Sequence, residues 1–222
     1  MNKDELYRMY REYANKLLDE FDDGVGGSGM YWNAMLVLQD RLNRFICKVN
    51  GIDCNKISRI QIVSAMLDEL GEMLKEFKPV WAWWIKKGEK TNEEKVLEEF
   101  VDFVHFYLTY LISFYKEDEL MDEGDEFYIE LGKRKDGIFA PIFSIIKMMW
   151  LVAEYGNTGA ISVVDLEETM GEFMETMGWD DRKVFEKYVE KSFENYLRQV
   201  GDGRYGKVPW EVLEAYAKGA WK

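Results

Sequence analysis

The chain has 222 residues and is 47% hydrophobic, which is enough for one large core and excludes a disordered protein. Its net charge of −13 argues against a protein that binds nucleic acid over its whole surface, although a metal and a few cations can still create a local phosphate site. Only three prolines interrupt the chain and no strand-like alternation is sustained, so the sequence predicts an all-α fold.

Hydrophobic periodicity predicts that most of the chain is helical, with glycine-rich or charged stretches between the helices. Ser58 and the run Thr91-Asn92-Glu93-Glu94 are typical helix starts. The predicted helices cover residues 3–21, 31–49, 58–77, 93–116, 139–155, 162–177 and 180–199, with a short helix at the C-terminus; the first is expected to be polar and exposed. The predicted loops cover residues 22–29, 78–90, 117–137 and 200–209.

The chain opens with no charged-then-apolar leader, and its longest apolar stretch, residues 138–153, is too short to span a membrane and contains Lys147. We therefore expect a cytoplasmic protein without a membrane partner. Cys47 and Cys54 lack the second cysteine pair or histidine partner that a zinc site needs. A disulfide between them is the alternative, but we expect two reduced thiols in a cytoplasmic protein.

Two acidic pairs are the main chemical signal: Glu69 with Glu72, and Glu99 with Asp102. Residues three apart project from the same face of a helix. Two such helices packed side by side bring four carboxylates to one point, where their mutual repulsion requires a cation. Ligation by oxygen alone suits Mg²⁺ or Mn²⁺, so the pattern favours a metal-dependent enzyme that acts on phosphate.

The surroundings of the second pair support this interpretation. The helix predicted from residue 93 is apolar nearly all round, which is typical of a buried helix. Carboxylates buried there are costly unless they are paired or bound to a metal. The alternative is that each pair belongs to the solvated acidic face of an amphipathic helix.

Other polar sets have two interpretations each. Gln39 and Asn43 lie four apart, so they either read the edge of a nucleobase or are ordinary surface amides. Lys191, Asn195 and Arg198 share a face and either clamp phosphate oxygens or form a basic helix end. The three tryptophans of the 78–90 loop either stack on a base or fill gaps between helices. The single histidine, His105, rules out a di-iron site with two Glu-x-x-His motifs and leaves a structural or a ligand-contact role.

Four stretches resemble, in the same order, the dimeric all-α dUTP pyrophosphatases. This family belongs to the all-α nucleoside triphosphate pyrophosphatase superfamily, together with the MazG-type enzymes. The acidic pairs are common to the superfamily, whereas the amide pair, the tryptophans, His105-Phe106 and the Lys/Asn/Arg set are more specific to the family. The stretches lie within residues 35–207 and are Leu38–Asn43, Asp68–Glu72 with Trp81–Lys87, Glu98–Phe106, and Tyr188–Gln199.

The resemblance implies a role for each candidate residue. Glu69, Glu72, Glu99 and Asp102 would be the catalytic carboxylates that hold Mg²⁺ (Mn²⁺ is possible), with Glu69 deprotonating the attacking water. Gln39 and Asn43 would read uracil, while Trp84, His105 and Phe106 would line the base and deoxyribose pocket. The phosphates would be held by Lys191, Asn195, Arg198, Tyr205 and a lysine after the tryptophans. This lysine is Lys86 or Lys87, and we name Lys87 as the candidate.

The resemblance also implies the reaction and the organisation of the chain. The expected reaction is hydrolysis of dUTP, and of dUDP as well, to dUMP by a homodimer. The expected parts are residues 1–29 as an N-terminal helix and glycine-rich loop, 30–116 as the core, 117–178 as a mobile helical insert, and 179–222 as the phosphate-binding helix and the C-terminal helix. Residues 1–29 and the absence of a lysine within Trp81–Trp84 depart from the family pattern.

Two other functions are compatible with the same residues. A dCTP/dUTP pyrophosphatase or a broad MazG-type enzyme would keep the carboxylates and change the base-reading amides. An acidic helical interaction protein would account for the net charge, but it would not account for carboxylates placed among phenylalanines.

Overall fold

The computed structural model describes residues 1–22, 29–85, 90–113, 137, 139–156, 163–201, 204 and 206–221. Within these ranges the regular structure is helical, apart from an isolated β-bridge between Val200 and Val208, and the predicted all-α fold is confirmed. The helices are α1 (Lys3–Phe21), α2 (Gly29–Asn50), the 3₁₀ turn η1 (Cys54–Lys56), α3 (Arg59–Glu76), α4 (Lys78–Trp81), α5 (Glu93–Ile112), α6 (Ala140–Tyr155), α7 (Val163–Met177), α8 (Asp181–Arg198) and α9 (Trp210–Ala220).

The helix starts are stabilised by local side-chain hydrogen bonds. The Gln61 side chain accepts from the backbone N–H of Ser58 at 3.0 Å, and Asn92 Oδ1 accepts from Lys95 N at 3.3 Å. One predicted loop is partly helical, because Pro79 occupies the first turn of α4, where its missing N–H costs nothing. The prediction of an unbroken loop over residues 78–90 is therefore wrong for Lys78–Trp81.

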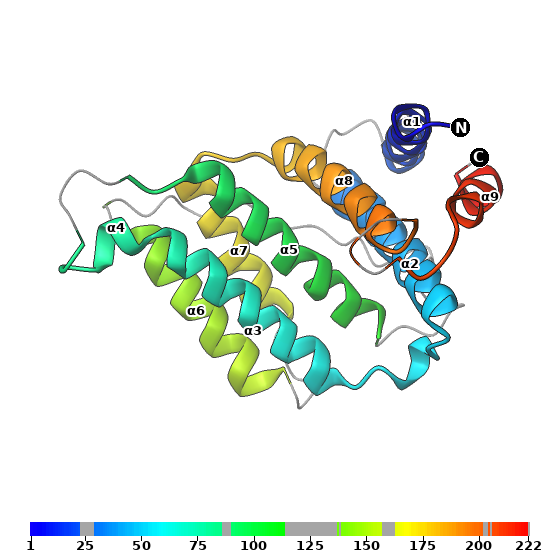
Figure 1. Cartoon of the computed structure of the whole chain (residues 1–222). Coiled ribbons are helices and arrows are strands. Elements are labelled where there is room, and N and C mark those ends of the chain that lie inside the picture. The colour runs from blue at the N-terminus through cyan, green and yellow to red at the C-terminus, as the bar shows by residue number, and fades with distance from the viewer. Residues whose placement is uncertain are drawn as a thin grey trace.

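Helix α5 lies at the centre of the bundle (Figure 1). Helices α3, α5, α6 and α7 run side by side, while α2 and α8 pair with each other and pack against α5. Phe100 and Phe103 of α5 are fully buried, and Phe100 packs against Phe173 of α7 with ring centroids 5.4 Å apart. Because neighbours surround α5, its nearly continuous apolar surface is accounted for.

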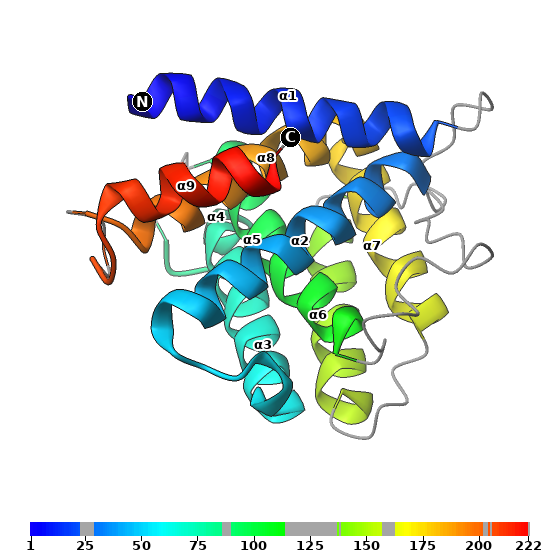
Figure 2. The same ribbon diagram turned by 90° about the vertical axis from the view of Figure 1, so that its right-hand side faces the viewer.

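Helix α1 covers the outer side of the α2–α8 pair together with α9 (Figure 2). The helix was predicted to be exposed, but one of its faces is buried: Leu6 and Tyr10 have no exposed surface, and the Tyr10 hydroxyl lies 2.7 Å from Ser192 Oγ. The chain ends meet there, since the N-terminal ammonium lies 3.3 Å from Glu214. Residues 1–22 therefore complete the core instead of forming a wholly exposed helix.

Cys47 and Cys54 form a disulfide, so the prediction of two reduced thiols is wrong. The reason is the turn after α2, in which Gly51 adopts a φ of 65° and Ile52 N donates to Cys47 O at 2.9 Å. This turn returns η1 to the last turn of α2 and leaves the two cysteine Cα atoms 5.7 Å apart, a normal separation for a disulfide.

The division of the chain into four parts stays a prediction. Helices α6 and α7, from the segment predicted as an insert, pack on each other, and α6 also packs on α3. Residues 114–136, 138 and 157–162 of that segment lie outside the described residues. None of the described helices combines the length and apolar character needed to cross a membrane.

Candidate active site

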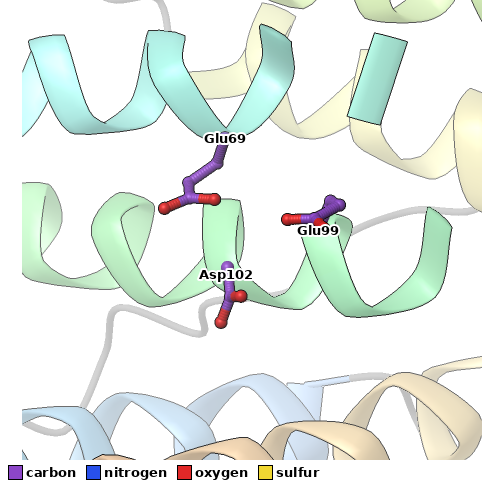
Figure 3. A group of neighbouring side chains, drawn as sticks. All are labelled: Glu69, Glu99 and Asp102. Atoms are coloured by element: carbon purple, nitrogen blue, oxygen red, sulfur yellow. The ribbon is translucent and has the colours of Figure 1, made fainter. Parts of the chain in front are cut away.

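Three of the four candidate carboxylates converge between α3 and α5. Oxygen atoms of Glu69, Glu99 and Asp102 all lie within 4.8 Å of one another. Figure 3 shows Glu69 reaching from α3 towards α5, which carries Glu99 and Asp102 one turn apart. The side-by-side packing of the two helices thus produces the arrangement expected from the i, i+3 spacing.

Glu72 lies on the same helix as Glu69 but does not join the cluster. Its carboxylate pairs with Lys75 on the next turn of α3 and is 43% exposed. Its charge is still near enough to raise the pKa of Glu99. The structure therefore brings together Glu69, Glu99 and Asp102, and leaves Glu72 at the edge of the group.

All three carboxylates of the cluster have raised pKa values, mainly because they are partly buried. Burial, followed by the neighbouring Asp102 and Glu99, raises the pKa of Glu69 to about 7. Burial and Asp102 raise the pKa of Glu99, and burial raises the pKa of Asp102 although Lys191 partly offsets it. A divalent cation placed among these oxygens would remove the repulsion, so three partly buried carboxylates fit a hard cation such as Mg²⁺ or Mn²⁺.

One cavity of about 630 Å³ connects this cluster with the predicted base-reading residues. Glu69 and Asp102 line one part of it, and Gln39 and Asn43 line another. Phe106 and His105, which the sequence placed beside the sugar and base, also line the cavity. A volume of this size is typical of a site for a small organic ligand.

The amides that line the cavity belong to a hydrogen-bonding network. Gln39 is only 3% exposed, and its carbonyl oxygen Oε1 lies 2.6 Å from both His105 Nδ1 and the Tyr188 hydroxyl. Because burial and the nearby cations of α8 lower the pKa of His105 to about 3, the ring is neutral at physiological pH. An amide oxygen can only accept, so Nδ1 carries the ring proton.

Helix α8 and the segment after it contribute positive charge to the site. Lys191 Nζ lies 2.7 Å from Asp102 Oδ2, and Arg198 Nη1 donates to Asn195 Oδ1 at 2.8 Å. Asn195 and Arg198 line the cavity, as do Arg204 and Lys207 of the following segment. The Val200–Val208 bridge folds this segment back over the end of α8. The side of the cavity next to the carboxylates therefore carries the positive charge that phosphate binding requires.

Of the predicted site residues not yet described, Trp84 has a known position, and it lies outside this arrangement. Trp84 is 63% exposed and stacks edge-on against Trp81 and Trp83, and it does not line the cavity. Lys87 and Tyr205 lie outside the described residues, as does Lys86. No contact with substrate is assigned to these residues from the structure.

Sequence reasoning missed several cavity residues, of which Thr109 is the most informative. Its hydroxyl contacts Gln39, Asn43 and the His105 carbonyl. The signal was its place on α5 one turn after His105, facing the same side. Apolar residues after the first two helices were missed as well, because only the fold brings them to the cavity: Ile52, Ile57 and Ile62.

Comparison with known proteins agrees with this geometry. No curated protein matches the chain. A family model described as dUTPase matches residues 31–203, a range that contains the carboxylate cluster, the amide network and the cations of α8. Members of this family are hydrolases that act on dUTP and depend on a divalent metal. The chain belongs to the all-α dUTPase family.

Proposed function

We propose that the protein hydrolyses dUTP to dUMP and pyrophosphate, and dUDP to dUMP and phosphate, with Mg²⁺ as the metal. The observation that carries this proposal is that one cavity is lined both by the carboxylates Glu69 and Asp102 and by the amide of Asn43. A uracil base near Asn43 would extend its phosphates towards the carboxylates and the cations of α8. The reaction would limit dUTP and supply dUMP.

The residues have separate tasks in this reaction. Glu69, Glu99 and Asp102, joined by Glu72 after it leaves Lys75, would hold the metal, whose charge stabilises the phosphate oxygens. Glu69 would accept the proton of the attacking water, a role that a carboxylate beside the metal can fill. Lys191, Asn195 and Arg198 would bind the phosphates, aided by Lys87 and Tyr205. His105 and Phe106 would bound the base and sugar, with Trp84 closing over them.

The direct test is incubation of the purified protein with dUTP, dUDP, dCTP, dTTP and UTP, each with Mg²⁺, with Mn²⁺ and with EDTA, followed by identification of the products. Metal-dependent release of dUMP and pyrophosphate from dUTP, without cleavage of dCTP, dTTP or UTP, is the expected result. Cleavage of several triphosphates would replace the uracil assignment with a dCTP/dUTP or MazG-type specificity. No metal-dependent hydrolysis of dUTP would reject the proposal.

We also propose that the protein is a homodimer that pairs through helix α6. Phe143, Ile146 and Trp150 are 65%, 49% and 55% exposed and lie three or four residues apart, so they form one apolar stripe. Exposed apolar stripes of this kind mark interfaces, and a stripe with coiled-coil spacing is self-complementary about a two-fold axis.

Light scattering tests the dimer directly. Wild type should have twice the chain mass of 26.3 kDa, and the double variant Phe143→Glu, Trp150→Glu should have the mass of one chain. Val212→Glu, an exposed apolar position on α9, is the matched control and should stay dimeric. A wild-type monomer would reject the dimer.

The proposed location is the cytoplasm, where deoxynucleotides are made and used. The Cys47–Cys54 disulfide argues against a cytoplasmic location, since thiols are kept reduced in the cytoplasm. Alkylation of intact cells followed by mass spectrometry decides the point: alkylated Cys47 and Cys54 support a reducing compartment, and a protected pair supports an oxidising one.

We also propose that residues 117–178, which the resemblance implies to be a mobile insert, close over the substrate. Exclusion of water from the phosphates by a closing segment would favour the reaction. Hydrogen exchange with and without a non-hydrolysable dUTP analogue tests it. Protection gained in this segment is expected, and unchanged exchange would remove the closing step.

A further inference from the structure

Gln39 uses its complete hydrogen-bonding capacity inside the protein. Its Oε1 accepts from His105 Nδ1 and from the Tyr188 hydroxyl, each at 2.6 Å. Its Nε2 donates to Asn43 Oδ1 at 2.8 Å and to Thr109 Oγ1 at 3.0 Å. A primary amide offers two acceptor and two donor positions, so none is left for a ligand. Gln39 therefore acts on a base only through the residues that it contacts.

The hydroxyl of Thr109 determines which way both amides point. It has one proton, which it donates to the His105 carbonyl at 2.9 Å, while Asn43 Oδ1 is farther away at 3.3 Å. The oxygen of Thr109 is then an acceptor, and it receives Gln39 Nε2 and Asn43 Nδ2 at 3.0 and 3.1 Å. If the two amides were turned over, two carbonyl oxygens would face this oxygen without a proton between them.

Asn43 is the member of the network that has capacity to spare. Its Oδ1 accepts from Gln39 and its Nδ2 donates one proton to Thr109, which leaves one N–H and one oxygen lone pair. Asn43 is half-buried and lines the cavity. It presents a donor and an acceptor side by side, in an order that Thr109 and Gln39 set.

The order of donor and acceptor on the Asn43 amide matters because uracil and cytosine present their own donor and acceptor in opposite orders. Uracil has a donor at N3 beside an acceptor at O4, whereas cytosine has an acceptor at N3 beside a donor at N4. A base held in one position by its sugar and phosphates therefore pairs with only one order of the Asn43 amide. The other base meets donor against donor and acceptor against acceptor, which costs binding free energy.

We propose that Thr109 and Gln39 are positioning residues that set the selection of uracil over cytosine, by fixing the order of donor and acceptor on the Asn43 amide. The inference rests on the proposed function for its substrate. Gln39 is held in its own orientation by Tyr188 and His105, and Thr109 prevents Gln39 and Asn43 from turning over together.

The test compares kcat/KM for dUTP and dCTP, and in parallel the Kd for dUMP and dCMP, in wild type and Thr109→Val. Valine has nearly the same shape but no acceptor, so both amide orders become available. The preference for uracil should fall roughly tenfold, the factor that corresponds to one hydrogen bond. Gln39→Glu is the second variant: its carboxylate cannot donate, so Asn43 must turn its N–H inward and the preference should shift in the same direction.

Two control variants distinguish an effect on the orientation of the amides from a general effect of the substitution on the structure. Thr109→Ser keeps the hydroxyl and should restore the preference. Thr169→Val removes a hydroxyl that makes the same kind of bond, to Asp165 O at 2.7 Å on α7, and should leave the preference unchanged. An unchanged preference in folded Thr109→Val and Gln39→Glu would overturn the inference. Absent hydrolysis would reject the proposed function alone, because the monophosphate affinities still report the base preference.

Discussion

Lys191 Nζ lies 2.7 Å from Asp102 Oδ2, so the ammonium group of α8 directly contacts the carboxylate cluster of α3 and α5. The two side chains are only 11% and 19% exposed, and solvent therefore weakens their attraction little. Among the described residues, Lys191 is the one that forms an ion pair with Asp102. A bound divalent cation would compete with it for the same oxygen and release it towards the phosphates.

This contact leads to the first prediction, for Lys191→Met. Loss of the ammonium leaves Asp102 without its partner, so the metal-free protein should lose ~2 kcal/mol of unfolding free energy. The stabilisation by Mg²⁺ should grow, because the metal no longer competes with Lys191. Urea unfolding with and without Mg²⁺ measures both quantities. An equal loss of stability in both conditions would show that Lys191 and the metal act at separate places.

The second prediction concerns Glu99→Gln. Burial and Asp102 raise the pKa of Glu99, which means that its charge is disfavoured in the folded protein. The amide should stabilise the metal-free protein by ~1 kcal/mol, a value reduced for partial exposure, and should abolish metal-dependent hydrolysis. Thermal unfolding in EDTA and an activity assay are the measurements. Glu168→Gln, on the exposed side of α7, is the matched control and should change neither.

The sequence was sufficient to predict the helices and most of the cluster, because both follow from local periodicity. The i, i+3 spacing placed Glu99 and Asp102 on one face of α5, since it depends only on helix geometry, and Glu69 joins them because α3 packs on α5. It did not show that Glu72 would pair with Lys75, because this pairing depends on the side-chain conformation of Glu72. Nor did it show the Thr109 contacts, which exist only because α2 packs across α5.

The third prediction is that Glu69 makes the unfolding free energy of the metal-free protein depend on pH. Its folded-state pKa is raised from 4.5 to about 7, so the folded protein binds the proton more tightly than the unfolded chain. The stability linked to that proton is complete below about pH 4.5 and is lost as the pH rises through 7. The difference in unfolding free energy between Glu69→Gln and wild type should therefore increase over this window and be constant above it.

Unfolding by urea at a series of pH values in EDTA measures this difference, and titrating groups remote from the cluster cancel between the two proteins. Saturating Mg²⁺ should remove the slope in wild type, because the metal replaces the proton. A difference that does not vary with pH would show that Glu69 has an ordinary pKa.

The fourth prediction separates the two amides of the cavity, Gln39 and Asn43. Gln39→Ala removes the acceptor of two buried donors, the Tyr188 hydroxyl and His105 Nδ1–H, so the protein should lose ~2 to 3 kcal/mol of unfolding free energy. Asn43→Ala removes a half-buried side chain next to the cavity, where water can replace its bonds, and should cost less than ~1 kcal/mol. The Asn43→Ala enzyme should still hydrolyse nucleotides in a metal-dependent reaction, but its kcat/KM should be about the same for dUTP and dCTP. The measurements are urea unfolding and kcat/KM for both nucleotides; an Asn43→Ala enzyme that still prefers dUTP would place base recognition elsewhere in the cavity.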